Sequence, residues 1–182
     1  MLILKRLEVT FTMKITIEAE TQDDYDQITK LHIEAFNGDD EAKLVERLRK
    51  TEKYNCKLSL VAKYKNQIIG HVLFYPVEIN TGIKKCQTLA LAPISVFPNF
   101  QHQGVGSRLI KEGLEKARKL GFQSVIVVGH SEYYPRFGFK KACKYGISTP
   151  FDVPDTAFFA IELEKDSLKK CSETVEYPKE FM

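Results

Sequence analysis

The most informative segment of the chain is Ile94-Ser95-Val96-Phe97-Pro98-Asn99-Phe100-Gln101-His102-Gln103-Gly104-Val105-Gly106-Ser107. It reads as the end of an apolar strand, followed by a loop and a helix whose first turn holds Gly104 and Gly106. The first turn of a helix leaves N–H groups without intrahelical partners, at the positive end of the helix dipole. Because glycine has no Cβ, a bulky anion can approach this backbone closely. The segment therefore predicts a phosphate-binding helix start.

Two well-known phosphate motifs fit this loop poorly. A P-loop needs Lys and then Ser or Thr after its second glycine, whereas Gly106 is followed by Ser107-Arg108-Leu109. A dinucleotide fingerprint needs a third glycine where Leu109 stands. The glycines alone leave two alternatives open: a helix start that packs on a strand with no ligand, and a generic phosphate-binding α/β protein.

The residues on either side predict an α+β arrangement. The expected elements are strands at 14–19, 58–64, 67–75, 86–96, 124–128 and 156–163, and helices at 21–36, 39–50 and 104–120. Lys65-Asn66 suits a tight hairpin turn, and Gly121 stands where a C-cap glycine is expected. Three adjacent strands after a helix pair favour an antiparallel meander over strict βαβ alternation.

Composition places the chain among ordinary globular domains. It has 182 residues, of which 43% are hydrophobic and 28% charged, and this excludes collagenous, low-complexity and wholly disordered chains. A net charge of +3 is too mild for a typical nucleic-acid-binding domain. No apolar stretch reaches the roughly 20 residues that a membrane span needs, and the N-terminus lacks the pattern of a signal peptide.

The cysteines carry no metal or redox motif. None of the four forms a C-x-x-C pair, and the histidines do not lie at zinc-finger spacing beside them. We therefore expect no metal site, a cytoplasmic protein, and reduced thiols at Cys56, Cys86, Cys143 and Cys171.

The quoted segment resembles the acetyl-CoA motif of the GCN5-related N-acetyltransferase (GNAT) superfamily. That motif is an apolar strand, Val-x-Pro, an aromatic residue, then Gln/Arg-x-x-Gly-x-Gly/Ala, and Val96-Phe97-Pro98, Phe100 and residues 101–106 correspond to it. Downstream, Tyr134-Pro135-Arg136-Phe137-Gly138-Phe139 resembles the family's Tyr-x-x-x-Gly-Phe element. Together with Gly129-His130-Ser131-Glu132-Tyr133, it makes the chain most similar to the YhbS-like subgroup.

The resemblance covers about residues 13–165 and implies the GNAT fold. This is an α+β domain in α/β/α layers, with a mixed sheet of about six to seven strands that splays between the fourth and the fifth. A cleaner pattern opens at Met13, so we expect residues 1–12 to be an N-terminal extension. Residues 166–182 are expected to be a C-terminal tail, in which Tyr177-Pro178 and Phe181-Met182 could dock on the domain.

The implied chemistry is direct transfer of the acetyl group of acetyl-CoA, the co-substrate, to a primary amine. The splayed strands would hold the pantetheine arm, and a strand N–H near Ile94 or Val96 would face the thioester oxygen as negative charge develops. The residues expected at acetyl-CoA are Ile94, Ser95, Val96, Gln101, His102, Gln103, Gly104, Val105, Gly106 and Ser107.

Proton transfer needs an acid and a base. Tyr134 matches the family's proton donor to the departing thiolate, with Tyr133 as the fallback, and an aromatic turn packed on the core is the alternative reading. The ammonium form of the acceptor must lose a proton to a base. His71, Glu78 and His130 are candidates for this base, and none is assigned.

The loop departs from the family pattern in its charge. His102 stands where glycine is common, and Gln101 and Gln103 replace frequent basic residues. Phosphate binding would then depend mainly on backbone N–H groups, with Arg108 or Lys111 offering long-range attraction.

A catalytically silent CoA-binding sensor or interaction module on the same fold is the alternative function. The acceptor stays open among an aminoglycoside, a polyamine, an amino acid and a protein N-terminus. Asp39, Asp40 and Glu41 would suit a cationic amine, and equally a solvated helix start. We expect no nucleic-acid and no membrane partner, and a homodimer would follow only by analogy.

Overall fold

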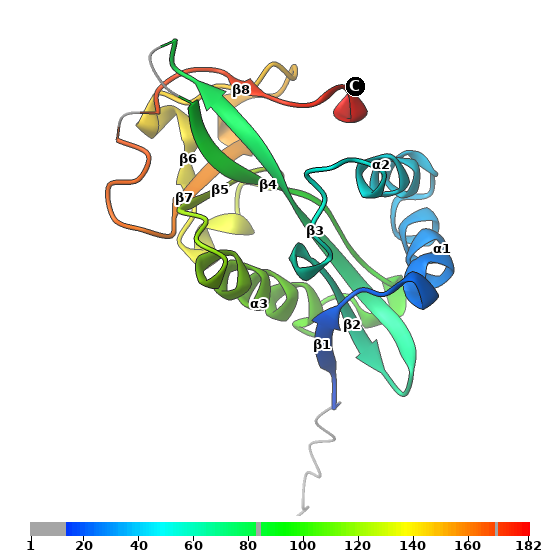
Figure 1. Cartoon of the computed structure of the whole chain (residues 1–182). Coiled ribbons are helices and arrows are strands. Elements are labelled where there is room, and N and C mark those ends of the chain that lie inside the picture. The colour runs from blue at the N-terminus through cyan, green and yellow to red at the C-terminus, as the bar shows by residue number, and fades with distance from the viewer. Residues whose placement is uncertain (1–13, 83–84, 170) are drawn as a thin grey trace, which may run out of the picture.

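A mixed sheet of eight strands forms the centre of the described part of the chain (Figure 1). The computed structural model describes residues 14–82, 85–169 and 171–182, so the expected extension at residues 1–12 lies outside the described residues. The strand order is β1-β2-β3-β4-β5-β7-β6, and β8 pairs with β3. The strands are β1 (Thr16–Ala19), β2 (Ser59–Tyr64), β3 (Gln67–Asn80), β4 (Lys85–Val96), β5 (Ser124–Val128), β6 (Lys140–Lys141), β7 (Phe158–Glu162) and β8 (Val175–Glu176).

β2, β3 and β4 form the predicted antiparallel meander, and β1 pairs antiparallel with β2. β2 and β3 are joined by Lys65 and Asn66, whose φ angles of 47° and 65° lie in the left-handed region, as a two-residue hairpin turn requires. β4 and β5 are parallel, whereas β7 pairs antiparallel with both β5 and β6. The described sheet exceeds the expected six to seven strands because it includes β6 and β8, each of two residues.

Helices cover both faces of the sheet (Figure 1). The α-helices are α1 (Tyr25–Phe36), α2 (Asp40–Arg49) and α3 (Val105–Lys119). Short 3-10 turns are η1 (Gln22–Asp24), η2 (Cys56–Leu58), η3 (Pro98–Phe100), η4 (Tyr134–Phe137), η5 (Ala142–Tyr145), η6 (Asp155–Ala157) and η7 (Lys179–Phe181).

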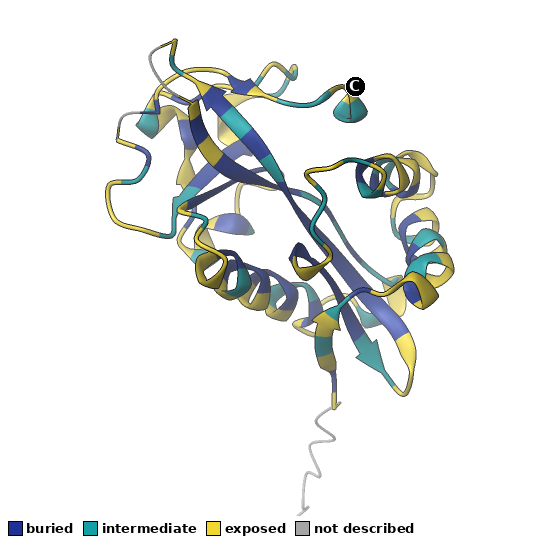
Figure 2. Ribbon diagram, viewed as in Figure 1, coloured by how far each residue is buried: buried dark blue, intermediate teal, exposed yellow. Residues whose placement is uncertain are grey.

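Alternate side chains of β3 point to opposite faces of the sheet and pack in two different hydrophobic cores. Phe74 packs in the core beneath α3, whereas Leu73 and Tyr75 pack with α2 on the opposite face. α3 approaches the sheet so closely at Gly113 that an added Cβ would stand 2.1 Å from the Phe74 ring. The buried inner side and exposed outer side of α3 confirm its predicted amphipathic pattern (Figure 2).

β4 and β5 splay apart as expected. Their parallel pairing is confined to Leu89 with Val125 and Ala90 with Ile126, although β4 continues to Val96. The β3–β4 register also shifts between Val72 and Phe74, next to a cis peptide bond between Ala92 and Pro93. From Leu91 to Val96, the edge of β4 that faces β5 has no strand partner among the described residues.

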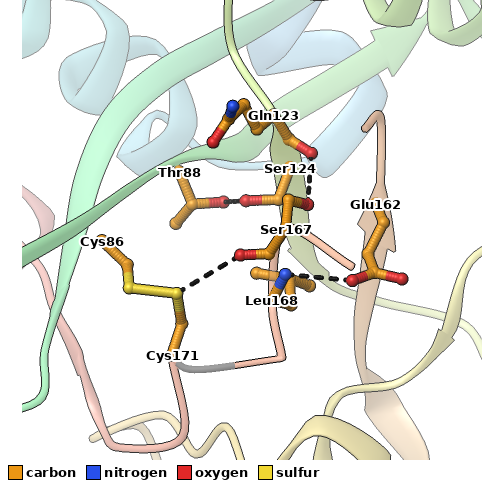
Figure 3. Close-up of a disulfide and its surroundings, with 8 residues drawn as sticks. All are labelled: Cys86, Thr88, Gln123, Ser124, Glu162, Ser167, Leu168 and Cys171. Atoms are coloured by element: carbon orange, nitrogen blue, oxygen red, sulfur yellow. Dashed lines mark hydrogen bonds between the residues drawn. A yellow bond between two sulfur atoms is a disulfide. The ribbon is translucent and has the colours of Figure 1, made fainter. Parts of the chain in front are cut away.

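The expectation of four reduced thiols is wrong for two of them. Cys86 at the start of β4 and Cys171 in the tail form a disulfide (Figure 3). Cys56 and Cys143 are free and exposed. The Cα atoms of the pair lie 5.9 Å apart although 85 positions separate them in sequence. Spacing along the chain carries no signal for such a pair, because the fold alone brings the two residues together.

The tail packs on the rest of the chain. β8 adds to the edge of β3, Tyr177 contacts the Phe151 ring, and Phe181 contacts the Tyr75 ring in the core. Arg47 of α2 donates Nε to the carbonyl of Glu180 at 3.0 Å. Among the described residues, no helix has the length and apolar character to cross a bilayer.

Candidate active site

A cavity opens where β4 and β5 diverge, at the N-terminus of α3. Its volume is about 650 Å³. It is lined by the end of β4, the first turn of α3, the segment after β5, and the loop between β4 and α3 (residues 97–104), which we call the glycine loop. The lining residues are Ile94, Ser95, Val96, Phe100, Gln101, His102, Gly104, Val105, Gly106, Ser107, His130, Tyr133, Tyr134 and Arg136. Nine of the ten residues predicted at acetyl-CoA line this cavity.

The glycine loop presents bare backbone to the cavity. Gly104 is the N-cap of α3 with a φ of 82°, a conformation that favours glycine, and no atom lies within 4 Å of the position of an added Cβ. The first intrahelical bond runs from Arg108 N to Gly104 O at 3.0 Å. The N–H groups of residues 105–107 precede that bond, so they have no acceptor within the helix and suit an anion.

Both loop glutamines stabilise the loop. Gln101 donates Nε2 to the carbonyl of Val96 at 3.1 Å, and Gln103 donates Nε2 to the carbonyl of Asn99 at 2.8 Å. Gln103 is the one predicted cofactor residue that does not line the cavity. These amides hold the connection between β4 and α3 at positions where basic residues are frequent in the family.

The two adjacent tyrosines occupy different parts of the cavity wall. The Tyr134 ring is 5% exposed and packs beside Phe139 and Phe159, and burial raises the pKa of its hydroxyl to about 12. That hydroxyl forms no hydrogen bond with another described residue. The Tyr133 hydroxyl instead lies at the start of α3, 2.8 Å from where a Cβ on Gly106 would stand.

Only one of the three base candidates lies at the cavity. His130 lines it, two residues after the end of β5. Glu78 lies on β3 and accepts hydrogen bonds from Lys53 at 2.9 Å and Lys85 at 2.8 Å. His71 is completely buried on the face of β3 that α1 covers.

His71 belongs to a set of polar side chains that we call the buried network: Glu20, His32, Arg49, Tyr54, Ser59 and His71. Arg49 donates Nε and Nη2 to the Glu20 carboxylate at 2.9 and 2.7 Å, and the Tyr54 hydroxyl donates to the same carboxylate. His71 Nε2 lies 3.2 Å from Glu20 Oε2, and its Nδ1 lies 2.9 Å from His32 Nε2. A carboxylate only accepts, so we assign the His71 proton to Nε2.

The buried network holds one ion pair and two neutral rings. Burial opposes the charge of Glu20, but hydrogen bonds from His71, Arg49 and Tyr54 outweigh it and hold the pKa of that carboxyl far below its usual range. Burial lowers the pKa of His32 to about 2 and also lowers the pKa of His71. Sequence reasoning missed this network, and its one available signal was a histidine, His32, on the apolar face of the first predicted helix.

Other charged candidates also lie away from the cavity. Arg108 donates Nη2 to the carbonyl of Ile15 at 2.9 Å, and neither it nor Lys111 lines the cavity. Asp39 forms an exposed ion pair with Lys43 at 2.7 Å, one turn along α2. The acidic run at residues 39–41 thus begins a helix and does not line the cavity.

Comparison with known proteins shows which family the chain belongs to. Residues 16–142 match the acetyltransferase (GNAT) domain. The chain is 37% identical to the N-acetyltransferase YjhQ of Escherichia coli K12 over 146 residues, which cover 80% of this chain and 78% of that protein. It is 32% identical to the N-acetyltransferase YhbS of the same strain over 166 residues, covering 91% and 97%.

Solved structures show the same fold. The crystal structure of YhbS from Escherichia coli in complex with CoA matches with a TM-score of 0.87 at 31% identity, over 93% of each chain. A GNAT acetyltransferase from Brucella melitensis in complex with acetyl-CoA matches with a TM-score of 0.75 at 29% identity, over 94% of this chain and all of that one.

Proposed function

This chain belongs to the GNAT acetyltransferase family, and on that premise we propose that it moves the acetyl group of acetyl-CoA directly to a primary amine. One observation carries the proposal: a single cavity joins the N–H groups at the start of α3 to Tyr134. Two relatives of similar structure were crystallised with CoA or acetyl-CoA, which supports this choice of ligand.

The cavity offers separate surfaces to the two ends of acetyl-CoA. The backbone N–H groups of residues 105–107 would bind the pyrophosphate, since Gly104 leaves open space beside them. The edge of β4 over residues 94–96 has no strand partner on its β5 side among the described residues, so it can bond the amides of the pantetheine arm. The thioester would then lie between this edge and Tyr134.

Tyr134 has the properties of the proton donor. The acceptor nitrogen attacks the thioester carbonyl, the C–S bond breaks, and the departing sulfur takes the hydroxyl proton of Tyr134. The proton that the new amide nitrogen loses then returns to the Tyr134 oxygen, so the products are a neutral amide and the CoA thiol. A pKa of about 12 keeps that hydroxyl protonated at neutral pH, and the buried ring holds it in position. We assign the proton of the acceptor ammonium to His130, because it is the base candidate that lines the same cavity.

Calorimetric titration with acetyl-CoA tests the binding half of the proposal. We expect the parent protein to bind and Gly104→Glu to show no detectable binding, since the new carboxylate would occupy the anion site. Gly82→Glu is the matched control: Gly82 also has a positive φ, 73°, and open space at its Cβ position, yet it lies in another loop. A parent that fails to bind at millimolar acetyl-CoA overturns the proposal.

A screen of amine acceptors, read by release of free CoA thiol, tests the transfer half. Aminoglycosides, polyamines, amino acids and N-terminal peptides are the classes to include. Thiol release that depends on one of these amines supports the enzyme. Binding of acetyl-CoA without transfer to any of them supports the alternative, a CoA-binding sensor on this fold.

A further inference from the structure

The cavity contains little positive charge for a site that would hold phosphates. Among its described lining residues, Arg136 is the one lysine or arginine. Gln101 and Gln103 stand where basic residues are frequent in the family, and their amides are already bonded to backbone carbonyls. Arg108, which is near in sequence, is bonded to the carbonyl of Ile15, the residue before β1. The cation therefore comes from a different segment, η4, after β5.

Arg136 is held in place with its donors free. Its Nε donates to the carbonyl of Tyr133 at 3.2 Å, and its guanidinium carbon lies 4.5 Å from the centroid of the Tyr133 ring. The Phe137 ring lies 5.6 Å away. Neither Nη atom forms a hydrogen bond with another described residue, so a planar pair of donors remains for an anion.

The Tyr133 ring connects this cation to the glycine loop. One face of the ring carries the Arg136 guanidinium, and its hydroxyl lies at Gly106 in the first turn of α3. The first turn of α3 and the guanidinium thus both neighbour the Tyr133 ring, and all three line the same cavity as Tyr134. The Tyr133 ring also contacts the Tyr134 ring, with the two ring centroids 5.3 Å apart.

We propose that Arg136 binds a phosphate of acetyl-CoA and supplies the positive charge that the glycine loop lacks. The inference rests on the proposed function, because it takes acetyl-CoA as the ligand of this cavity. The shared chemistry is a phosphate oxygen accepting from the two Nη atoms. CoA offers two sources of it, the pyrophosphate and the 3′-phosphate of the ribose.

Calorimetry of the Arg136→Gln variant with three ligands tests the proposal and separates the sources. We expect CoA to bind about 10-fold more weakly than it binds the parent, the usual effect of losing a charge-assisted hydrogen bond. Pantetheine, which has no phosphate, should bind both proteins equally. Dephospho-CoA should lose the same factor if Arg136 holds the pyrophosphate, and nothing if it holds the 3′-phosphate.

Arg47→Gln is the matched control. Arg47 is also exposed and also donates Nε to a backbone carbonyl, but it lies on α2, away from the cavity. An equal loss of CoA affinity in Arg47→Gln would mean that general protein charge is responsible, and this overturns the inference. A loss of pantetheine affinity in Arg136→Gln would also overturn it, because Arg136 would then hold the shape of the cavity.

The outcomes also distinguish the inference from its premise. A parent protein that does not bind CoA overturns the proposed function itself. A parent that binds CoA, together with an Arg136→Gln variant that binds it within about twofold, overturns the inference alone. Arg136→Lys keeps the charge but not the planar pair of donors, so its affinity should lie between those of the parent and Arg136→Gln.

Discussion

The cavity at the start of α3 and the buried network beneath α1 and α2 lie on opposite faces of the sheet, and both are rich in polar side chains. In the buried network, Glu20 has three side-chain donors, Arg49, Tyr54 and His71. In the cavity, the α3 N–H groups, the Tyr134 hydroxyl and the Arg136 Nη atoms have no bond to another described side chain.

This difference separates polar groups that stabilise the fold from those that are free to bind a ligand. A buried charge whose hydrogen bonds are all made has nothing left to offer a substrate. His71 illustrates the point: it is a histidine close to the cavity, pairing with Ser95 across β3 and β4, and yet its two nitrogens are already engaged. Each prediction below tests one side of this comparison, in order of decreasing effect.

Tyr134→Phe should give the largest change. Loss of the proton donor is expected to lower kcat by about 10²- to 10⁴-fold, while the affinity for acetyl-CoA stays the same. Steady-state thiol release and calorimetry measure the two quantities. Tyr133→Phe is the paired variant, and we expect it to retain most of kcat. A Tyr134→Phe enzyme with full activity would contradict the assigned role.

Glu20→Gln should lower the free energy of unfolding by about 3–5 kcal/mol, because it leaves Arg49 buried without a countercharge. Urea denaturation measures the change. The folded fraction should still bind acetyl-CoA like the parent, since Glu20 does not line the cavity. Glu115→Gln, which breaks an exposed ion pair with Arg118, serves as control and should cost no more than about 1 kcal/mol. Equal losses in the two variants would remove the distinction between the regions.

Tyr54→Phe should have a smaller effect on stability, about 2 kcal/mol, because one hydrogen bond to the Glu20 carboxylate is lost while Arg49 and His71 remain. Urea denaturation again gives the value. Tyr64→Phe removes a hydroxyl that has no hydrogen bond to another described residue and should stay within about 0.5 kcal/mol of the parent. A Tyr54→Phe variant as stable as the parent would show that the third donor to Glu20 is dispensable.

Stability should also fall as the pH is lowered, through His32. Its pKa of about 2 in the folded protein lies below the usual 6.5, so only the unfolded chain takes up this proton between those values. The unit from pH 6.5 to 5.5 should therefore cost about 1 kcal/mol from this ring, and each further unit about 1.4 kcal/mol. His32→Gln removes that contribution, and urea midpoints at pH 6.5 and 5.5 would show the shallower dependence. An unchanged slope would contradict the lowered pKa of His32 in the folded protein.

Local patterns in the sequence predicted much of the fold and the position of the cavity. The glycine loop, α3 and the hairpin at Lys65-Asn66 depend on residues close together in the chain, so their signals are readable there. Nine predicted residues meet at the cavity because one strand–loop–helix unit supplies them.

Long-range partners left no such signal. The Glu20–Arg49 pair and the Cys86–Cys171 bond join residues 29 and 85 positions apart, and only the packing of whole elements determines that they meet. Arg136 lay within a recognised motif, yet nothing in its spacing showed that it would stack on Tyr133 at the cavity.

The Cys86–Cys171 bond also closes a covalent ring within the chain. That ring encloses the glycine loop, both tyrosines and Arg136, whereas α1, α2 and the first three strands lie outside it. A protease that cuts once between the two cysteines leaves its products joined, so they migrate together on a gel until a thiol reductant is added. A cut before residue 86 releases the N-terminal piece at once under denaturing conditions. Limited digestion with and without reductant therefore reports which half of the molecule was cut.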